Sequence, residues 1–349
     1  MVYRMKDVAE RAGVSVTTVS HVLNKTRHRT IALGTRHRVL QVVQELNYYT
    51  NAHARRLAKS RSDSFGLIVS EIANPFFSEV IKGFEASAME HGFELLLCYT
   101  EYDQDRTQAA VRKMIENKVR GVAAMTSTFD RAFAEELATQ HVPVVLLGPG
   151  PAQPGISQIQ IDFSQGMGQA IDHLRELGHN SFAFISGPLN IRSAVNVRSA
   201  FVESLVQRGL GSFRTVDCNY KVDGGISAIR SLLAHPNFPT AILCGNDLIG
   251  LGAISALEEV GISVPEDVSV VGYDDILFAR LARPPLTTVT VPRERLGKLA
   301  YEALEKMQRS KQKSSHYLVE TQLVVRKSAG PPRNHDLQIH APALFANKA

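Results

Sequence analysis

Hydrophobic positions follow two different patterns along the chain, and the pattern changes near residue 63. Over roughly the first 50 residues, apolar side chains recur every three or four positions, as they do on one face of a helix. From Phe65 onward, short runs that are apolar throughout alternate with amphipathic stretches. The pattern therefore predicts a small helical head followed by a larger body of alternating strands and helices.

The apolar pattern of the head predicts two short helices joined by a tight turn. A third helix is expected to complete their hydrophobic core. Gly13 permits a sharp turn, and Ser15 is placed to cap the helix that follows. A further amphipathic helix runs from about Thr35 to Leu46. The inward positions of the first two helices are Val8, Ala9, Ala12, Val19, Val22 and Leu23. This order is typical of a helix-turn-helix, whose second helix enters the DNA major groove.

Three side chains remain on the outward side of the second predicted helix. Thr17 and His21 can hydrogen-bond to base edges, and Val16 can touch a thymine methyl group. A plain helical hairpin is the alternative interpretation, and charge argues against it. Residues 1–62 carry twelve Lys and Arg against three Asp and Glu, a net charge of +9, within a chain of net charge +5. A basic head on a mildly acidic body indicates nucleic-acid binding.

The stretch NAHARRLAKSRSDS, which begins at Asn51, has little apolar surface to bury. We interpret it as a linker that becomes helical only on DNA. Leu57 would then act as a wedge in the minor groove, where base unstacking is compensated by a larger contact area.

The body predicts an α/β fold with two similar halves. Its apolar runs are FGLIVS, FELLLCY, GVAAMT and PVVLLG in the first half, then SFAFISG, TAILCG and VSVVGY in the second. Strands that are apolar throughout and separated by helices indicate parallel sheets covered on both faces. Two such series of roughly 100 residues predict two doubly wound subdomains, with a ligand cleft between them at the carboxyl ends of the strands.

Candidate ligand groups fall just after predicted strands or on the helices that follow them. Aromatic rings can cover the C–H face of a sugar, while carboxylate, amide and guanidinium groups pair with its hydroxyls. A core role is the alternative for either phenylalanine taken alone. The candidates are Asn74, Phe76, Phe77, Ser127, Arg192, Arg198, Tyr220, Asn246 and Asp274.

Several motifs in the right order carry a family resemblance. The segments DVAERAGVSVTTVSHVLN, RRLAKSRS and GLIVSEIANPFFSEVIKGFE resemble the lactose-repressor/galactose-repressor family of bacterial transcription regulators, and the head is most similar to its purine-repressor branch. The resemblance runs from about Lys6 to Lys327. It implies a periplasmic-binding-protein type of body, in which the chain crosses between lobes three times, and a cavity that holds a neutral sugar.

The resemblance also implies DNA contacts for the second helix and the linker. Val16, Thr17 and His21 match positions that read bases, and Leu57 matches a leucine that opens a base step. The candidate DNA-binding residues are Ser15, Val16, Thr17, Thr18, Ser20, His21, Asn24, Arg27, Tyr48, Asn51, Ala54, Arg55, Leu57, Ala58 and Lys59.

This chain departs from the family pattern in three places of the head and in two of the body, one of which is the loop NIRSAVNVR that ends at Arg198, about one residue longer than in the family. The loop after Asn24 is about two residues longer, Ala32 stands where a serine commonly caps the third helix, and the segment before the linker lacks its usual proline. Val291 stands where many sugar-responsive relatives have a polar residue. Two other ligands are therefore alternatives. One is a phosphorylated sugar, whose phosphate Arg192 would bind, and the other is a nucleobase.

Other classes of protein fit less well. The chain has no G-x-G-x-x-G, P-loop, G-x-S-x-G or H-E-x-x-H pattern, so we expect neither an enzyme nor a bound cofactor. Its three isolated cysteines suggest neither disulfides nor zinc. No apolar run is long enough to span a bilayer and no signal peptide is evident, so a cytoplasmic protein without membrane contact is expected. A periplasmic receptor would lack the basic head.

The sequence thus predicts a repressor with four segments. Residues 1–50 form the helix-turn-helix head, 51–62 the linker, 63–327 the effector-binding and dimerisation domain, and 328–349 a disordered tail. A homodimer would bind palindromic double-stranded operator DNA, and a small-molecule effector, preferably a sugar, would control that binding. The sequence does not indicate whether the effector releases or promotes DNA binding, or whether the protein forms a dimer or a tetramer.

Overall fold

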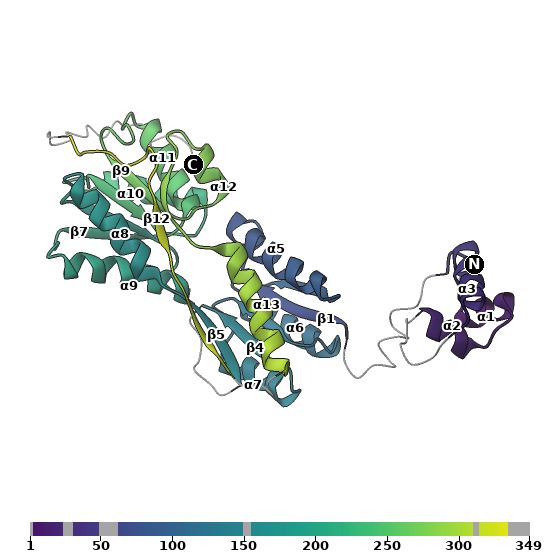
Figure 1. Ribbon diagram of the computed structural model, residues 1–349. Coiled ribbons are helices and arrows are strands. Elements are labelled where there is room, and N and C mark those ends of the chain that lie inside the picture. Colours follow the sequence, from purple (N-terminus) through teal and green to yellow (C-terminus); the bar gives the residue numbers. More distant parts are fainter. Residues whose placement is uncertain (1–2, 24–30, 49–61, 149–154, 310–313, 334–349) are drawn as a thin grey trace. The chain divides into compact units, whose positions relative to one another are not determined.

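A computed structural model describes residues 3–23, 31–48, 62–148, 155–309 and 314–333. The chain divides into two compact units, Met1–Ser62 and Asp63–Ala349 (Figure 1). Within the described ranges, none of the helices combines the length and the apolar character that crossing a membrane requires.

The first unit is the predicted three-helix head. Its helices are α1 (Met5–Ala12), α2 (Val16–Leu23) and α3 (Leu33–Glu45). Gly13 ends α1 with φ 63°, a left-handed conformation that glycine adopts without strain. The Ser15 hydroxyl accepts the Thr18 N–H at 3.1 Å and so caps α2. Ala32 precedes α3 without a side-chain cap, as its methyl group dictates.

The second unit contains two six-stranded sheets, one in each lobe. The first lobe orders its strands β11-β5-β4-β3-β1-β2, all parallel. The second orders them β12-β10-β9-β8-β6-β7, parallel except for the antiparallel pair of β10 and β12. The strands are β1 (Ser64–Val69), β2 (Glu94–Tyr99), β3 (Val122–Met125), β4 (Val144–Leu147), β5 (Ile156–Ile161), β6 (Phe182–Ser186), β7 (Phe213–Asp217), β8 (Ala241–Cys244), β9 (Ser269–Asp274), β10 (Thr287–Thr290), β11 (His316–Val319) and β12 (Gln322–Val324).

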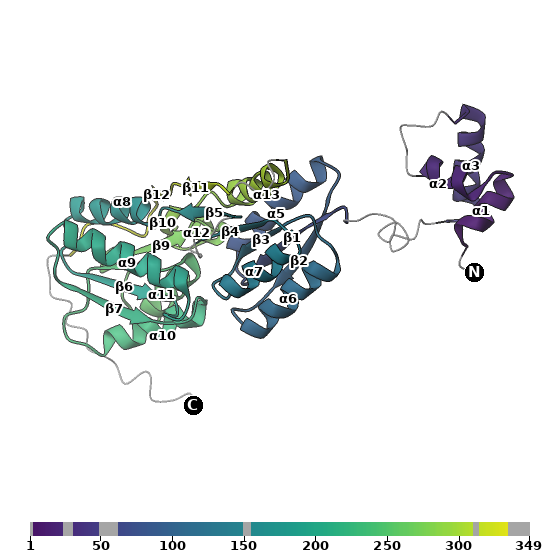
Figure 2. The same cartoon turned by 90° about the horizontal axis from the view of Figure 1, so that it is seen from below.

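Helices cover both faces of each sheet, as the apolar strands require. In the first lobe α5 and α13 pack on one face, and α6 and α7 on the other. In the second lobe α8 and α9 cover one face, and α10 and α11 the other (Figure 2). Neighbouring residues of β6 alternate between these two cores. The helices are α5 (Pro75–Glu90), α6 (Gln104–Glu116), α7 (Arg131–Thr139), α8 (Phe163–Glu176), α9 (Arg192–Gln207), α10 (Val222–Leu233), α11 (Asp247–Glu259), α12 (Leu277–Leu281) and α13 (Arg293–Arg309).

The chain passes between the lobes three times, as the family resemblance implied. It passes from β5 to α8, from β10 to α13 and from β11 to β12, and Figure 1 shows β11 and β12 as a long yellow segment that spans both lobes. Thr321 ties two of these connections together. Its hydroxyl donates to the Asp162 carbonyl at 2.6 Å and accepts the Gly166 N–H at 3.0 Å.

The described structure continues past the expected boundary at residue 327, as far as Arg333. The buried Ser328 hydroxyl accepts the Thr287 N–H at 2.8 Å and donates to the Val270 carbonyl at 2.6 Å. The Gly330 carbonyl lies 2.9 Å from Nε2 of the buried His179. Arg333 forms an ion pair with Asp267. Residues 334–349 lie outside the described ranges.

Candidate functional site

The outward face of α2 carries the side chains that the sequence analysis singled out. Val16 is 43% exposed, Thr17 is exposed and His21 is half-buried, whereas Val19 and Val22 are buried in the head core. An exposed valine at the start of a short helix has no packing role within this head. The exposed side therefore combines an apolar contact with two hydrogen-bonding groups, the set that base edges in a major groove require.

Four other predicted DNA-binding residues, Ser15, Thr18, Ser20 and Tyr48, are described within the head. Ser15 and Thr18 bond to each other, with 2.9 Å between their hydroxyl oxygens, and Ser20 is half-buried on α2. Tyr48 is only 9% exposed and packs in the head core. The candidates outside the described residues are Asn24, Arg27, Asn51, Ala54, Arg55, Leu57, Ala58 and Lys59.

A cavity of about 110 Å³ lies between the two lobes of the second unit. It is located where the carboxyl ends of strands from both sheets face each other, the position expected for a ligand in this class of fold. All but one of the predicted ligand residues line it. They are Asn74, Phe76, Phe77, Ser127, Arg192, Tyr220, Asn246 and Asp274.

Arg198 was also predicted to bind ligand, and it is the predicted residue that does not line this cavity. Its Nη1 donates to Asp217 at 3.0 Å and its Nη2 donates to Thr215 at 2.8 Å, and both partners belong to β7. The residue therefore fixes α9 against the edge strand of the second sheet, away from the cavity lining. Arg192, at the start of the same helix, lines the cavity instead.

Aromatic rings form a large part of the cavity wall. The rings of Phe76 and Phe77 lie edge to face at 5.2 Å, and the Asn74 side chain fixes their position by accepting the Phe76 N–H at 2.9 Å. Tyr220 lies so close to Gly187 that no side chain larger than hydrogen fits there. Burial raises the pKa of Tyr220, so its hydroxyl stays protonated and can donate to a ligand.

Sequence reasoning missed the residues that reach the cavity from loops and interlobe connections. Tyr102 lies at φ 59° after β2, in a loop whose conformation the apolar pattern does not encode. Tyr273 lies within a run interpreted as an apolar strand. The other lining residues that were not predicted as ligand groups are Ser70, Met125, Thr126, Leu147, Gly148, Ile161, Phe163, Ser193, Val197, Gly245 and Val291.

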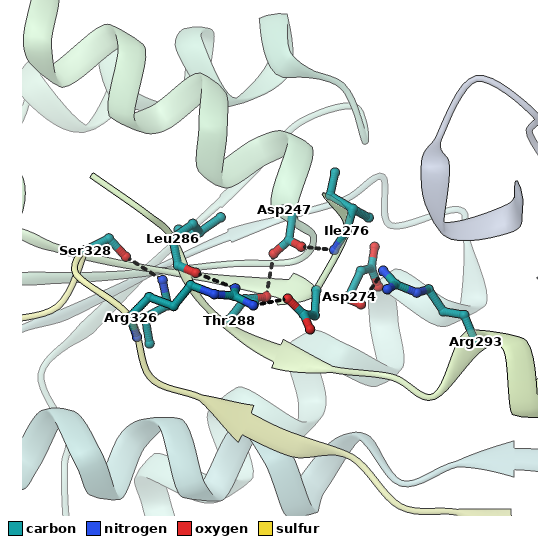
Figure 3. Close-up of polar contacts among 10 residues, drawn as sticks. Asp247, Asp274, Ile276, Leu286, Thr288, Arg293, Arg326 and Ser328 are labelled. Carbon is teal, nitrogen blue, oxygen red and sulfur yellow. Dashed lines mark hydrogen bonds and ion pairs between the residues drawn. The ribbon is translucent and has the colours of Figure 1, made fainter. Parts of the chain in front are cut away.

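An acidic turn at the end of β9 supplies the carboxylate of the cavity. Asp274 and Asp275 have φ values of 109° and 56°, which are unfavourable for residues with a Cβ. Burial raises the pKa of Asp274 well above its usual range, the nearby Asp247 raises it further, and Arg293 opposes both effects. Figure 3 shows these groups together with the residues that hold them.

Asp247, the first residue of α11, supports the turn that contains Asp274 and Asp275. Its Oδ2 accepts the Ile276 N–H at 2.7 Å, and its Oδ1 accepts the Thr288 hydroxyl. Burial raises the pKa of Asp247 to about 7, although both hydrogen bonds favour the ionised form. Among the described residues, no cluster of three His, Cys, Asp or Glu side chains could hold a metal ion.

Comparison with known proteins identifies both units. The family model for bacterial regulatory proteins of the lacI family matches residues 4–51, and a periplasmic-binding-protein-like domain matches residues 171–329. The HTH-type transcriptional repressor PurR of Photobacterium profundum is 37% identical over 334 residues, which cover 93% of this chain and 98% of that protein.

Solved structures show the same relationship. The lac repressor dimer bound to operator and the anti-inducer ONPF has a TM-score of 0.85 at 28% identity, covering 95% of this chain and all of that one. The complex of the transcriptional regulator CelR with cellobiose has a TM-score of 0.70 at 29% identity, covering 94% and 100%. These relatives are regulators rather than enzymes. The chain belongs to the lacI family of bacterial regulatory proteins and is a helix-turn-helix transcriptional repressor with a ligand-binding effector domain.

Proposed function

We propose that the protein represses transcription as a cytoplasmic homodimer on a palindromic double-stranded operator, under the control of one small molecule in the interlobe cavity. The exposed face of α2, with Val16, Thr17 and His21, is the observation that carries the operator-reading role. Because two heads related by a dimer axis meet inverted half-sites, the operator should be palindromic.

Selection of bound sequences from random DNA, followed by fluorescence anisotropy, tests this role. Thr17→Ala and His21→Ala should each lower affinity for the selected operator about tenfold and relax the base preference at one position of each half-site. Binding to unrelated DNA, which depends on phosphate contacts, should stay unchanged and salt-dependent. Retention of the wild-type base preference in both variants would contradict the proposal.

The proposal assigns the linker at 51–62 to the centre of the operator. On the family resemblance, Leu57 enters the minor groove, so Leu57→Ala should lose most specific affinity and keep non-specific binding. Arg55, Lys59, Ala54 and Ala58 would lie beside it. Unchanged operator affinity of Leu57→Ala in a gel-shift titration would remove this role.

Exposed apolar residues support a dimer in which each lobe contacts its counterpart. On the short helix α12, Leu277, Phe278 and Leu281 are 54%, 48% and 60% exposed. In the first lobe the edge strand β2 leaves Leu97 and Tyr99 exposed. We expect Leu281→Glu to shift the protein to monomers in sedimentation velocity and to weaken operator binding, while Leu189→Glu, at an exposed site between β6 and α9, leaves the dimer intact.

A sugar is the effector that the cavity favours. Aromatic rings from both lobes can cover a sugar ring, and the carboxyl oxygens of Asp274 can accept hydrogen bonds from its hydroxyls. The related regulator CelR has been solved with cellobiose. A nucleobase is the second candidate, because Arg198 is held outside the cavity and because Met125, Leu147 and Val291 line it. This apolar part of the lining favours a flat ring with fewer hydroxyls.

A thermal-shift screen with sugars, sugar phosphates and purines separates these candidates, since a bound ligand raises stability by mass action. We expect a sugar to raise Tm in the wild type and to have little effect on Asp274→Ala. A response to purines alone would replace the sugar by the second candidate. Operator titrations with and without the active compound then determine whether it releases or promotes DNA binding.

A further inference from the structure

Arg293 makes a contact between the lobes at the edge of the cavity. It is the first residue of α13, which packs in the first lobe, and it follows the connection from β10 directly. Its Nη1 donates to the carbonyl oxygen of Asp274 at 2.8 Å, and Asp274 ends β9 in the second lobe. Figure 3 shows the guanidinium group of Arg293 beside Asp274. The residue therefore joins the backbone of a cavity-lining residue in one lobe to a helix of the other.

The acidic turn needs such support because its backbone is unfavourable. Consecutive positive φ angles at Asp274 and Asp275 persist only where the surroundings hold them. Asp247 holds the next residue by accepting the Ile276 N–H. Arg326, which follows β12, forms an ion pair with Asp275 and donates to the Leu286 carbonyl at 2.8 Å. Both of these supports come from the second lobe, whereas Arg293 comes from the first.

The helix that carries Arg293 is in turn tightly fixed to α5. A Cβ at Gly297 of α13 would overlap the Val80 carbonyl, and a Cβ at Gly83 of α5 would overlap the Glu294 carbonyl. The two backbones are therefore in direct contact and closely packed. Asn74 caps α5, and Phe76 and Phe77 lie in its first turn, so the N-terminal end of α5 lines the cavity. Arg293, at the N-terminal end of α13, contacts the cavity residue Asp274. Arg293 therefore lies between the acidic turn and the helix pair whose other member carries Phe76 and Phe77.

We propose that Arg293 is a positioning residue that sets the relative orientation of the two lobes by holding the Asp274 turn from the opposite lobe. The inference rests on the proposed function in one respect, namely that the cavity is where the effector binds. A ligand that engages Asp274 then acts on this link directly, because the same residue supplies both the carboxylate to the ligand and the carbonyl to Arg293. Occupancy of the cavity and lobe orientation are coupled through one residue.

Fluorescence energy transfer between the lobes tests the proposal without ligand or operator. Cysteines replace Thr139 at the end of α7 and Val206 on α9, both exposed, while Cys98 and Cys218 become serine and the buried Cys244 stays. Doubly labelled full-length protein is mixed with an excess of unlabelled protein, so that each dimer holds one labelled chain. The compared proteins are the wild type, Arg293→Met and Arg326→Met, each checked for folding by circular dichroism.

Arg326→Met is the matched control, because it removes the same residue type from the same turn within a single lobe. We expect Arg293→Met to shift and broaden the distribution of transfer efficiency, and Arg326→Met to lower Tm while leaving the distribution unchanged. An unchanged distribution in Arg293→Met, or an equal shift in both variants, overturns the proposal. If Arg293→Met does not fold, Arg293→Gln is judged by the same criterion. Failure of every compound in the effector screen would leave this result intact, so the two proposals fail separately.

Discussion

At the scale of single residues, burial and hydrogen bonding have opposite effects on the ionisation of Asp247. It is fully buried beneath the cavity, and it accepts two hydrogen bonds that suit a carboxylate. Burial nevertheless raises its pKa to about 7, the neighbouring Asp275 raises it too, and Arg293 lowers it. Because the unfolded chain holds this carboxyl at a pKa of about 4, the folded state binds a proton between these values that the unfolded state has lost.

Stability should therefore fall as pH rises from about 4 to 7 because of this residue, and level off above its folded pKa. Asp247→Asn can still accept the Ile276 N–H and has no proton to release. We expect its free energy of unfolding to rise relative to that of the wild type across this window, by at most about 1.4 kcal/mol per pH unit. Urea unfolding at pH 5 and pH 7.5 measures the change. Asp105→Asn, at an exposed carboxyl of α6, is the control, and a pH-independent gap for Asp247→Asn would contradict the argument.

At the scale of elements, two pairs of helices cross on reciprocal glycines, one pair in each lobe. Gly83 and Gly297 bring α5 and α13 into backbone contact, and Gly225 and Gly252 do the same for α10 and α11. In each case a Cβ would meet a main-chain carbonyl, which cannot rotate away as a side-chain tip can. The distance between these helices is therefore fixed by the absence of a side chain.

Gly297→Ala should destabilise the protein by about 2–3 kcal/mol, because the added methyl group forces the two helix backbones apart. Equilibrium unfolding in urea measures the loss. Gly211→Ala, at a site where a Cβ meets open space, should stay within about 0.5 kcal/mol of the wild type. A loss for Gly297→Ala no larger than that of the control would show that the helices can separate at little cost.

The hydrophobic pattern predicted those strands that are apolar on both faces and missed those that are not. β5 carries Ser157, Gln158 and Gln160, and β7 is an edge strand with half-buried residues, so neither forms an apolar run. Most of the predicted ligand residues line the cavity because parallel strands end on one side of a sheet. Arg198 does not, because it pairs with Asp217, and that pairing depends on how α9 packs against β7, which no local pattern records.

At the scale of the whole molecule, the last described segment closes the second lobe. The buried His179 lies within hydrogen-bonding distance of Thr240, Ser269 and the Gly330 carbonyl, and burial lowers its pKa. Ser328 satisfies one N–H and one carbonyl of the neighbouring strands. These are buried polar groups of the lobe core, so the segment that pairs with them is part of the fold rather than an appendage.

A chain that ends after Lys327 should be at least about 3 kcal/mol less stable than one that ends after Arg333, because several buried polar groups lose their partners. Tm and urea unfolding of the two truncated proteins measure the difference. The substitution Arg333→Ala in the longer protein removes only the exposed side of the ion pair with Asp267 and should cost less than a third of that amount. Equal stability of the two truncated proteins would contradict the structural role of 328–333.

The three passages between the lobes also limit how such a repressor can be rebuilt by recombination. Each lobe is assembled from separate stretches of sequence. Recombination within the second unit would therefore place strands from two different proteins in the same sheet. The junction at Ser62 and Asp63, where the chain divides into its two compact units, separates no strands of a sheet. Recombination at this junction can therefore join the complete head of one repressor to the complete second unit of another. A new effector response is then expected to arise by substitutions within an intact second unit.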